Sequence, residues 1–205
     1  MISHFNAGNV WGRIISAEKG KSQKGVPYVW IKIDCSGEHG SFYVSGRMWG
    51  AEKVDGLISH FKKNPAETIR FRGFMEQFTK KVAYWNFTFY SWEPATGKPH
   101  KAAFVLRGEV TGTGVETVGD REDGRVGMHL RRPGKNDYPD IEEDVDIFIA
   151  AADRLRDVLP GQMWEFKGYI SQGGGEDEFG MAGGMIRPYI KWLGRVNEAA
   201  RGDNE

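Results

Sequence analysis

The sequence has little cysteine and no long apolar runs. Cys35 is the single cysteine among 205 residues, which excludes an intramolecular disulfide framework and a zinc site built from several cysteines. No apolar run approaches the roughly 20 residues of a membrane-spanning helix. The first residues, MISHFNAGNVWGR, also lack the basic and then apolar order of a signal peptide. We therefore expect a cytoplasmic protein with Cys35 buried in a strand.

The sequence also lacks net charge, but this average conceals a division. Lys and Arg number 28, as do Asp and Glu. Residues 1–101 hold 15 cations and 8 carboxylates, a balance of +7, whereas residues 102–205 hold 13 and 20, a balance of −7. Such a difference is expected when one half contacts a polyanion and the other does not. Aromatic residues, at 13%, are plentiful, and this is a second functional indication.

In the first half, hydrophobic periodicity predicts five strands and one helix. Alternation with period 2 indicates strands at residues 10–17, 27–35 and 41–49, and helical spacing follows at residues 51–63. Residues 67–92 then contain two strands joined by a turn at residues 78–81. The order strand, strand, strand, helix, strand, strand is that of the five-stranded Greek-key OB barrel.

The second half repeats this order. Strands are predicted at residues 104–113, 125–131, 144–150, 163–171 and 185–193, with a short helical piece at residues 151–159. The segment WEFKGYISQ also matches IRFRGFMEQ of the first half. The string Gly112-Thr113-Gly114 indicates a hairpin loop.

Together these patterns predict an all-β fold with short helices. It would consist of two tandem five-stranded OB-type Greek-key barrels, each with a helix between strands three and four. The expected domains are residues 1–94, basic and rich in aromatics, and residues 104–196, acidic. A linker at residues 95–103 joins them, and a polar tail covers residues 197–205.

The outward positions of the first half combine rings with cations. In an OB fold, the face of strands two and three and the loops beside it bind oligonucleotides. Rings stack on unpaired bases, while Lys and Arg neutralise phosphates. The candidate nucleic-acid-binding residues are Lys19, Lys21, Lys24, Tyr28, Trp30, Lys32, Tyr43, Arg47, Trp49, Arg70, Arg72, Phe74, Lys80 and Lys81. Since a duplex hides its base faces, the expected partner is single-stranded DNA, with RNA left open.

Other interpretations of the same side chains stay open. Outward rings on a small barrel also cover its ends, pack against a second barrel or form a dimer interface, and lysines in a loop are often only solvated. The alternative function is therefore a protein-interaction or assembly module that uses the aromatic face as a protein interface. The inward rings Trp85, Phe87, Phe89, Trp164 and Phe166 are assigned to the core. The residues that alternate with the first three rings are expected to point outward: Tyr84, Asn86, Thr88 and Tyr90.

The second half has a different outward set. Its members are mixed in sign and poorer in rings: Arg125, His129, Arg131, Asp144, Asp146, Phe148, Glu165, Lys167 and Tyr169. The acidic stretch DYPDIEEDVD at residues 137–146 would repel phosphate. It is either a solvated surface or a docking site for a basic replication or recombination protein.

Catalytic constellations are weak. The five histidines are scattered without metal-ligand spacing, and the glycine-rich strings lack a phosphate-binding context. We therefore expect neither enzyme activity nor a cofactor or metal. A metal-dependent nuclease at the acidic run is the remaining enzymatic alternative.

With these motifs in view, the chain resembles the OB-fold single-stranded DNA-binding proteins, in particular the divergent ones of bacteriophages and integrative mobile elements. The resemblance rests on GRIISAEKGKSQKGVPYVWIKID, SFYVSGRMW and TIRFRGFMEQF, within roughly the first 95 residues. It implies protection of unpaired DNA during replication or recombination, without catalysis. The ending ARGDNE differs from the acidic tip, closing in an apolar aromatic residue, of the usual bacterial proteins, so partner recruitment stays open. A homodimer also stays open, and tandem barrels weaken any expectation of a homotetramer.

Overall fold

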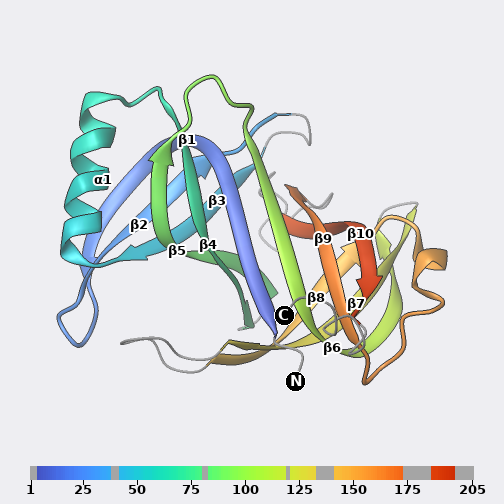
Figure 1. Cartoon of the computed structure of the whole chain (residues 1–205). Helices are drawn as coiled ribbons and strands as arrows, with labels where there is room; N and C mark the ends of the chain where they lie inside the picture. Colours follow the sequence, from blue (N-terminus) through green and yellow to red (C-terminus); the bar gives the residue numbers. More distant parts are fainter. Residues whose placement is uncertain are drawn as a thin grey trace, which may run out of the picture. The chain divides into compact units, whose positions relative to one another are not determined.

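The computed structural model describes residues 4–37, 42–79, 83–118, 121–132, 141–172 and 186–196. The described chain is mostly β-strand, with one α-helix (Figure 1). It divides into two compact units. The N-terminal unit is Ala7–Ala103 with Ile170–Arg187, and the C-terminal unit is Met1–Asn6, Phe104–Tyr169 and Pro188–Glu205. Among the described residues, no helix has the length and apolar character needed to cross a membrane.

The N-terminal unit has the predicted order of elements. These are β1 (Phe5–Lys21), β2 (Pro27–Asp34), β3 (Tyr43–Trp49), α1 (Ala51–Lys63), β4 (Thr68–Thr79) and β5 (Ala83–Pro94). The strands pair in the order β2-β3-β5-β4-β1, and β2 also pairs with β1, so the pairing returns to its start. The β3–β5 pair is parallel and the others are antiparallel. Helix α1 contacts β2 and β3 and is the coiled ribbon beside these strands in Figure 1.

Alternating apolar side chains build the core of this unit. Val29, Ile31 and Ile33 of β2 are fully buried, as is Cys35 just beyond it, which confirms the predicted inward face. Burial raises the pKa of the Cys35 thiol, because a thiolate would lose its hydration there. At Gly12 of β1 the backbone passes so close to β2 that an added Cβ would lie 2.3 Å from the Asp34 carbonyl oxygen. Glycine at this position thus permits close contact between the two strands.

The β4–β5 pair confirms one face of its prediction and corrects the other. Trp85, Phe87 and Phe89 of β5 are buried as expected, and the Phe87 and Phe89 rings stack at 5.5 Å. Asn86 and Thr88, expected to point outward into solvent, are buried as well. Neighbouring strands on both sides cover these two short side chains, since β5 lies between β3 and β4. The Thr88 hydroxyl donates a hydrogen bond of 2.9 Å to Glu76.

The C-terminal unit uses the same pairing order. Its elements are β6 (Lys101–Val118), β7 (Arg121–Arg132), β8 (Ile141–Ile149), the 3-10 helix η1 (Ala152–Leu155), β9 (Met163–Gln172) and β10 (Ile186–Arg195). The order is β6-β7-β8-β10-β9, with β6 also paired to β9. Trp164 and Phe166 are buried, as predicted.

One local prediction in this unit holds in part, and another is wrong. The helix expected at residues 151–159 is a single 3-10 turn, held by bonds such as Arg154 N–H to the Ala151 carbonyl at 3.2 Å. Pro160 and Gly161, the latter at φ 78, follow before an α-helix can develop. The loop expected at Gly112-Thr113-Gly114 lies inside β6, where these residues pair with β7. Glycine here accompanies a register shift after Val110 rather than a turn.

The segment between the two sets of strands contains a turn and then strand. The Lys98 N–H donates to the Ala95 carbonyl at 3.0 Å, and Gly97 has φ 73, which favours glycine. Strand β6 starts at Lys101, within the stretch expected as a linker.

Candidate nucleic-acid interface

The outer face of the N-terminal unit places rings and cations in neighbouring rows across four strands. In one row Trp30 of β2 pairs with Arg47 of β3, Arg47 with Thr88 of β5, and Thr88 with Phe74 of β4. In the next row Tyr28 pairs with Trp49. We call Tyr28, Trp30, Arg47, Trp49 and Phe74 the aromatic face. The structure thus brings together five of the residues predicted from the sequence, from three strands.

Arg47 occupies the centre of the aromatic face. Its guanidinium carbon lies 5.4 Å from the centroid of the Trp30 ring and 5.8 Å from that of Trp49. The Tyr28 and Trp49 rings are 5.0 Å apart. A cation held over two indoles is attracted by their π-electrons, and this restrains all three side chains. The face is therefore ordered before any ligand arrives, while its members stay half-buried and accessible.

Exposed tyrosines flank this face. Tyr43 is 52% exposed, and the Lys32 ammonium lies 4.9 Å from its ring centroid. Tyr90 is 40% exposed and its ring is 5.2 Å from that of Phe74. The sequence-based set omitted Tyr90. Alternation places Tyr90 on the outward side of β5, and its exposure agrees with that pattern although the candidate set left it out. The register shift between Arg72 and Gly73 leaves Tyr90 without a register partner on β4.

Arg70 and Arg72 lie farther along β4 and are engaged within the protein. Both donate to Glu93 Oε1, at 3.1 and 3.0 Å, and Arg70 also donates to Asn9 at 3.0 Å. The Arg70 guanidinium lies 5.0 Å from the ring centroid of Trp11, another ring that the prediction omitted. These two cations therefore already share a carboxylate, which a phosphate would have to replace.

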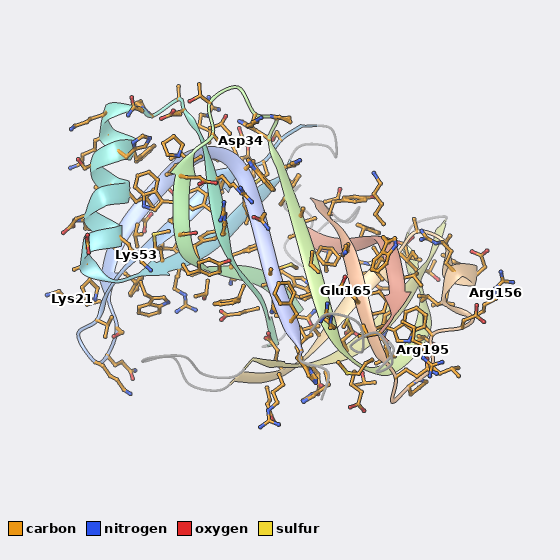
Figure 2. The ribbon with its side chains drawn as sticks, in the orientation of Figure 1. Lys21, Asp34, Lys53, Arg156, Glu165 and Arg195 are labelled. Atoms are coloured by element: carbon orange, nitrogen blue, oxygen red, sulfur yellow. The ribbon has the colours of Figure 1, made fainter. Side chains whose placement is uncertain are left out.

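The predicted basic loops are described in part. Strand β1 continues through Lys19 to Lys21, so both lysines lie at a strand end, and Lys24 follows in a turn closed by Ser22 N–H to Val26 carbonyl at 2.9 Å. Lys19 Nζ lies 2.5 Å from Asp55 of α1. Figure 2 shows Lys21 and Lys53 at the end of the unit where α1 begins. Lys80 and Lys81 fall outside the described residues.

In the C-terminal unit, the corresponding face of β7 and β8 is covered by ion pairs. Arg125 lies 3.9 Å from Asp146, and Arg131 lies 3.1 Å from Glu142. Phe148, predicted to point outward, is buried, with its ring centroid 6.4 Å from that of Tyr189. Residues 133–140, which include the start of the acidic stretch, fall outside the described part.

Strand β9 carries a second charge cluster. Glu165 accepts hydrogen bonds from Arg107 and lies 3.0 Å from Lys167. Burial alone would raise the pKa of Glu165, but these two cations outweigh it and lower the pKa. Lys167 also lies 4.6 Å from the ring centroid of Trp192, which is 47% exposed.

The described histidines pair individually with other groups. His60 lies 2.7 Å from Glu67, and His129 lies 2.9 Å from Asp144. His4 accepts a hydrogen bond from the Arg131 backbone N–H at 3.0 Å, and burial lowers its pKa. Within the described ranges, no three His, Cys, Asp or Glu side chains gather in a way that could hold a metal ion.

Comparisons with known proteins agree with this architecture. The chain is similar to the crystal structure of the wild-type single-stranded DNA-binding protein from Thermus aquaticus, with a TM-score of 0.67 and 13% sequence identity. The match covers 100% of this chain and 97% of that chain. A deletion variant of the Thermus aquaticus protein matches with a TM-score of 0.64 and 14% identity, over 100% of both chains. No protein-family model matches, and neither does any curated protein. The chain therefore shares the all-β fold of these proteins.

Proposed function

We propose that this protein binds single-stranded DNA through the aromatic face, largely without sequence preference and without catalysis. The observation that carries this proposal is the convergence of Tyr28, Trp30, Arg47, Trp49 and Phe74 on the outer side of three strands. Ordinary solvated strand faces carry Thr, Ser, Glu and Lys, so half-buried indoles around an arginine need another explanation. The shared fold with single-stranded DNA-binding proteins supports the same conclusion.

The geometry suits unpaired bases and their phosphates. Each ring offers a flat apolar partner, and stacking one base is worth about 1 to 3 kcal/mol whatever the base. Arg47 supplies positive charge among the rings, and Lys32 supplies it beside Tyr43. Neutralised phosphates release counterions, so affinity should fall as salt rises. Bases stacked inside a duplex cannot reach these rings, and single strands are therefore the preferred ligand.

The proposal extends to the organisation of the chain. We infer two OB-type barrels with domains at residues 1–94 and 104–196, supported by the same strand order in both sets of strands. The lysines at positions 19, 21 and 24, together with Lys80 and Lys81, would add positive charge for the DNA strand beyond the aromatic face. The C-terminal barrel would extend the DNA-binding surface, contact a second copy or dock a partner. Roles in replication or recombination, and a phage or mobile-element type, rest on the family resemblance.

Titration of the protein with oligo-dT at two salt concentrations tests this function. The fluorescence of Trp30 and Trp49 should be quenched when the oligonucleotide binds, and the affinity should weaken as the salt concentration rises. Absence of binding at low salt would contradict the proposal. A protein interface at the same face would instead ignore the oligonucleotide and show a size that depends on protein concentration. Degradation of the oligonucleotide on adding magnesium or manganese would indicate a nuclease.

A further inference from the structure

A cleft of about 370 Å³ adjoins the aromatic face of the N-terminal unit. The end of β1, the start of β2 and the first turns of α1 surround it. Its lining includes Lys19, Lys21, Tyr28, Ala51, Val54 and Asp55. Its volume lies within the range of small-molecule sites in proteins, about 300 to 1,000 Å³.

One wall of the cleft is aromatic and another is aliphatic. Tyr28 forms one wall, and its ring packs at 5.0 Å against Trp49, so the cleft continues the aromatic face. The Gly20 backbone lies so close to this ring that an added Cβ would be 2.5 Å from it. Val54, 2% exposed, and Ala51 supply aliphatic surface from α1. Such a space suits one planar aromatic ligand next to stacked ones.

The polar groups of the cleft form a donor and acceptor pair. Lys19 Nζ lies 2.5 Å from Asp55 Oδ1, and their side chains are 54% and 67% exposed, so both can reach a ligand. Lys21 adds a cation beside them. Guanine presents the O6 acceptor next to the N1–H and N2–H donors, which matches a lysine beside a carboxylate able to accept two bonds. Thymine replaces the amine with a carbonyl oxygen, which would face a carboxylate oxygen.

We propose that this cleft binds one unpaired guanine at an end of the strand that lies on the aromatic face. Asp55 accepts from the N1–H and N2–H groups, Lys19 donates to O6, and Lys21 faces the neighbouring phosphate. This rests on the proposed function, to which it adds a preference for one base at one position. Elsewhere on the face, stacking remains indifferent to sequence.

The test compares oligo-dT with oligonucleotides of equal length that carry a single guanine at the 5′ end, at the 3′ end or in the middle. Guanine at one end should tighten binding by at least about fivefold, the low end of what a bidentate base contact gives, whereas guanine in the middle should not. Asp55→Asn removes the charged acceptor, and Ala51→Leu fills the cleft. Each variant should therefore bind the end-guanine oligonucleotide and oligo-dT with equal affinity, so that the ratio of the two affinities becomes one. Ala66→Leu, which changes an exposed alanine beyond the C-terminal end of α1, is the matched control and should keep the ratio of the wild type.

The outcomes separate the two proposals. Equal binding of all four oligonucleotides would overturn the guanine cleft and leave single-stranded DNA binding in place. A guanine preference that persists in both Asp55→Asn and Ala51→Leu would overturn the cleft as its location. Failure of every oligonucleotide to bind would overturn the function itself. Because Asp55 is exposed, its variant should unfold at the same temperature as the wild type, so loss of the ratio is not loss of the fold.

Discussion

The two units share a strand order, but the arginines on their corresponding strands contact different kinds of side chain. On β2 and β3 of the N-terminal unit, Arg47 lies against the Trp30 and Trp49 rings, whereas on β7 and β8 Arg125 and Arg131 lie against carboxylates. An aromatic ring does not cancel the positive charge of a neighbouring cation, whereas a carboxylate offsets it. One architecture thus presents one face suited to a polyanion and another with its charges balanced.

The sharpest test of this difference compares two tryptophans that each lie near a cation. Trp30→Ala should weaken binding to oligo-dT by about 1 to 3 kcal/mol, because it removes a stacking platform. Trp192→Ala removes a ring that lies 4.6 Å from Lys167 in the C-terminal unit and should change the affinity by less than about 0.5 kcal/mol. Fluorescence anisotropy of a labelled oligonucleotide measures both. Equal losses would show that both units stack bases.

The salt dependence of binding should distinguish the cations of the two units. Phosphates that replace Glu93 at Arg70 and Arg72 would release counterions, so Arg70→Ala with Arg72→Ala should lower the salt slope by up to about two phosphate contacts. Arg125→Ala with Arg131→Ala, the matched pair in the C-terminal unit, should leave the slope as it is. Titrations over a salt series give both slopes. An unchanged slope in the Arg70 and Arg72 double variant would show that these two arginines do not contact phosphates.

Glu165 in the C-terminal unit allows the contribution of a carboxylate paired with two cations to be measured as a change in folding stability. The Glu165 side chain is 13% exposed, and its pKa is lower in the folded protein than in the unfolded chain. The ionised carboxylate therefore stabilises the fold at pH values above the unfolded-state pKa. This stabilisation is lost as the pH falls through the folded-state pKa. Glu165→Gln should therefore destabilise the protein by about 1 kcal/mol near pH 7, and the deficit should shrink as the pH approaches about 3.

Glu142→Gln changes a carboxylate that is 55% exposed and is the control for Glu165, with little expected effect on stability. Urea unfolding at both pH values measures the free energies. A deficit for Glu165→Gln that grows on acidification would contradict the assigned cause of its low pKa.

The smallest expected effect is a gain of affinity. Glu93 holds both Arg70 and Arg72, so Glu93→Gln should free them for phosphate and tighten binding about twofold to threefold at low salt, as suits exposed ion pairs. Glu142→Gln releases Arg131 in the C-terminal unit and should have no such effect. Direct titration at low salt measures both variants. A weaker Glu93→Gln complex would show that Glu93 positions the arginines instead of competing for them.

The alternation of side chains made much of the fold predictable. In β2 the inward set from Val29 to Cys35 and the outward Tyr28 and Trp30 follow directly from a period of two residues. Such a pattern reports which way a side chain points, and the helix between strands three and four then indicated the topology. The convergence of Trp30, Arg47 and Phe74 in one row follows from that topology.

Features that depend on partners distant in sequence were not predictable. The burial of Thr88 depends on strands on both sides of β5, and the register shift at Arg72 and Gly73 is set by the pairing of β4 with β5. The engagement of Arg70 by Glu93 is a cross-strand contact over 23 positions. Local composition also favoured a loop at Gly112 and a helix after Ala151, but strand pairing and Pro160 decided otherwise.

The reactivity of the buried Cys35 thiol can be used to measure how often the N-terminal unit opens. A thiol that is fully covered and whose pKa is raised by burial should react with maleimides only when the N-terminal unit opens. A new cysteine at Ala66, which is exposed and lies outside the candidate binding residues, could therefore carry a fluorophore without removal of the native one. The rate at which Cys35 becomes labelled, with and without oligonucleotide, would then measure how strongly a bound strand holds that unit closed.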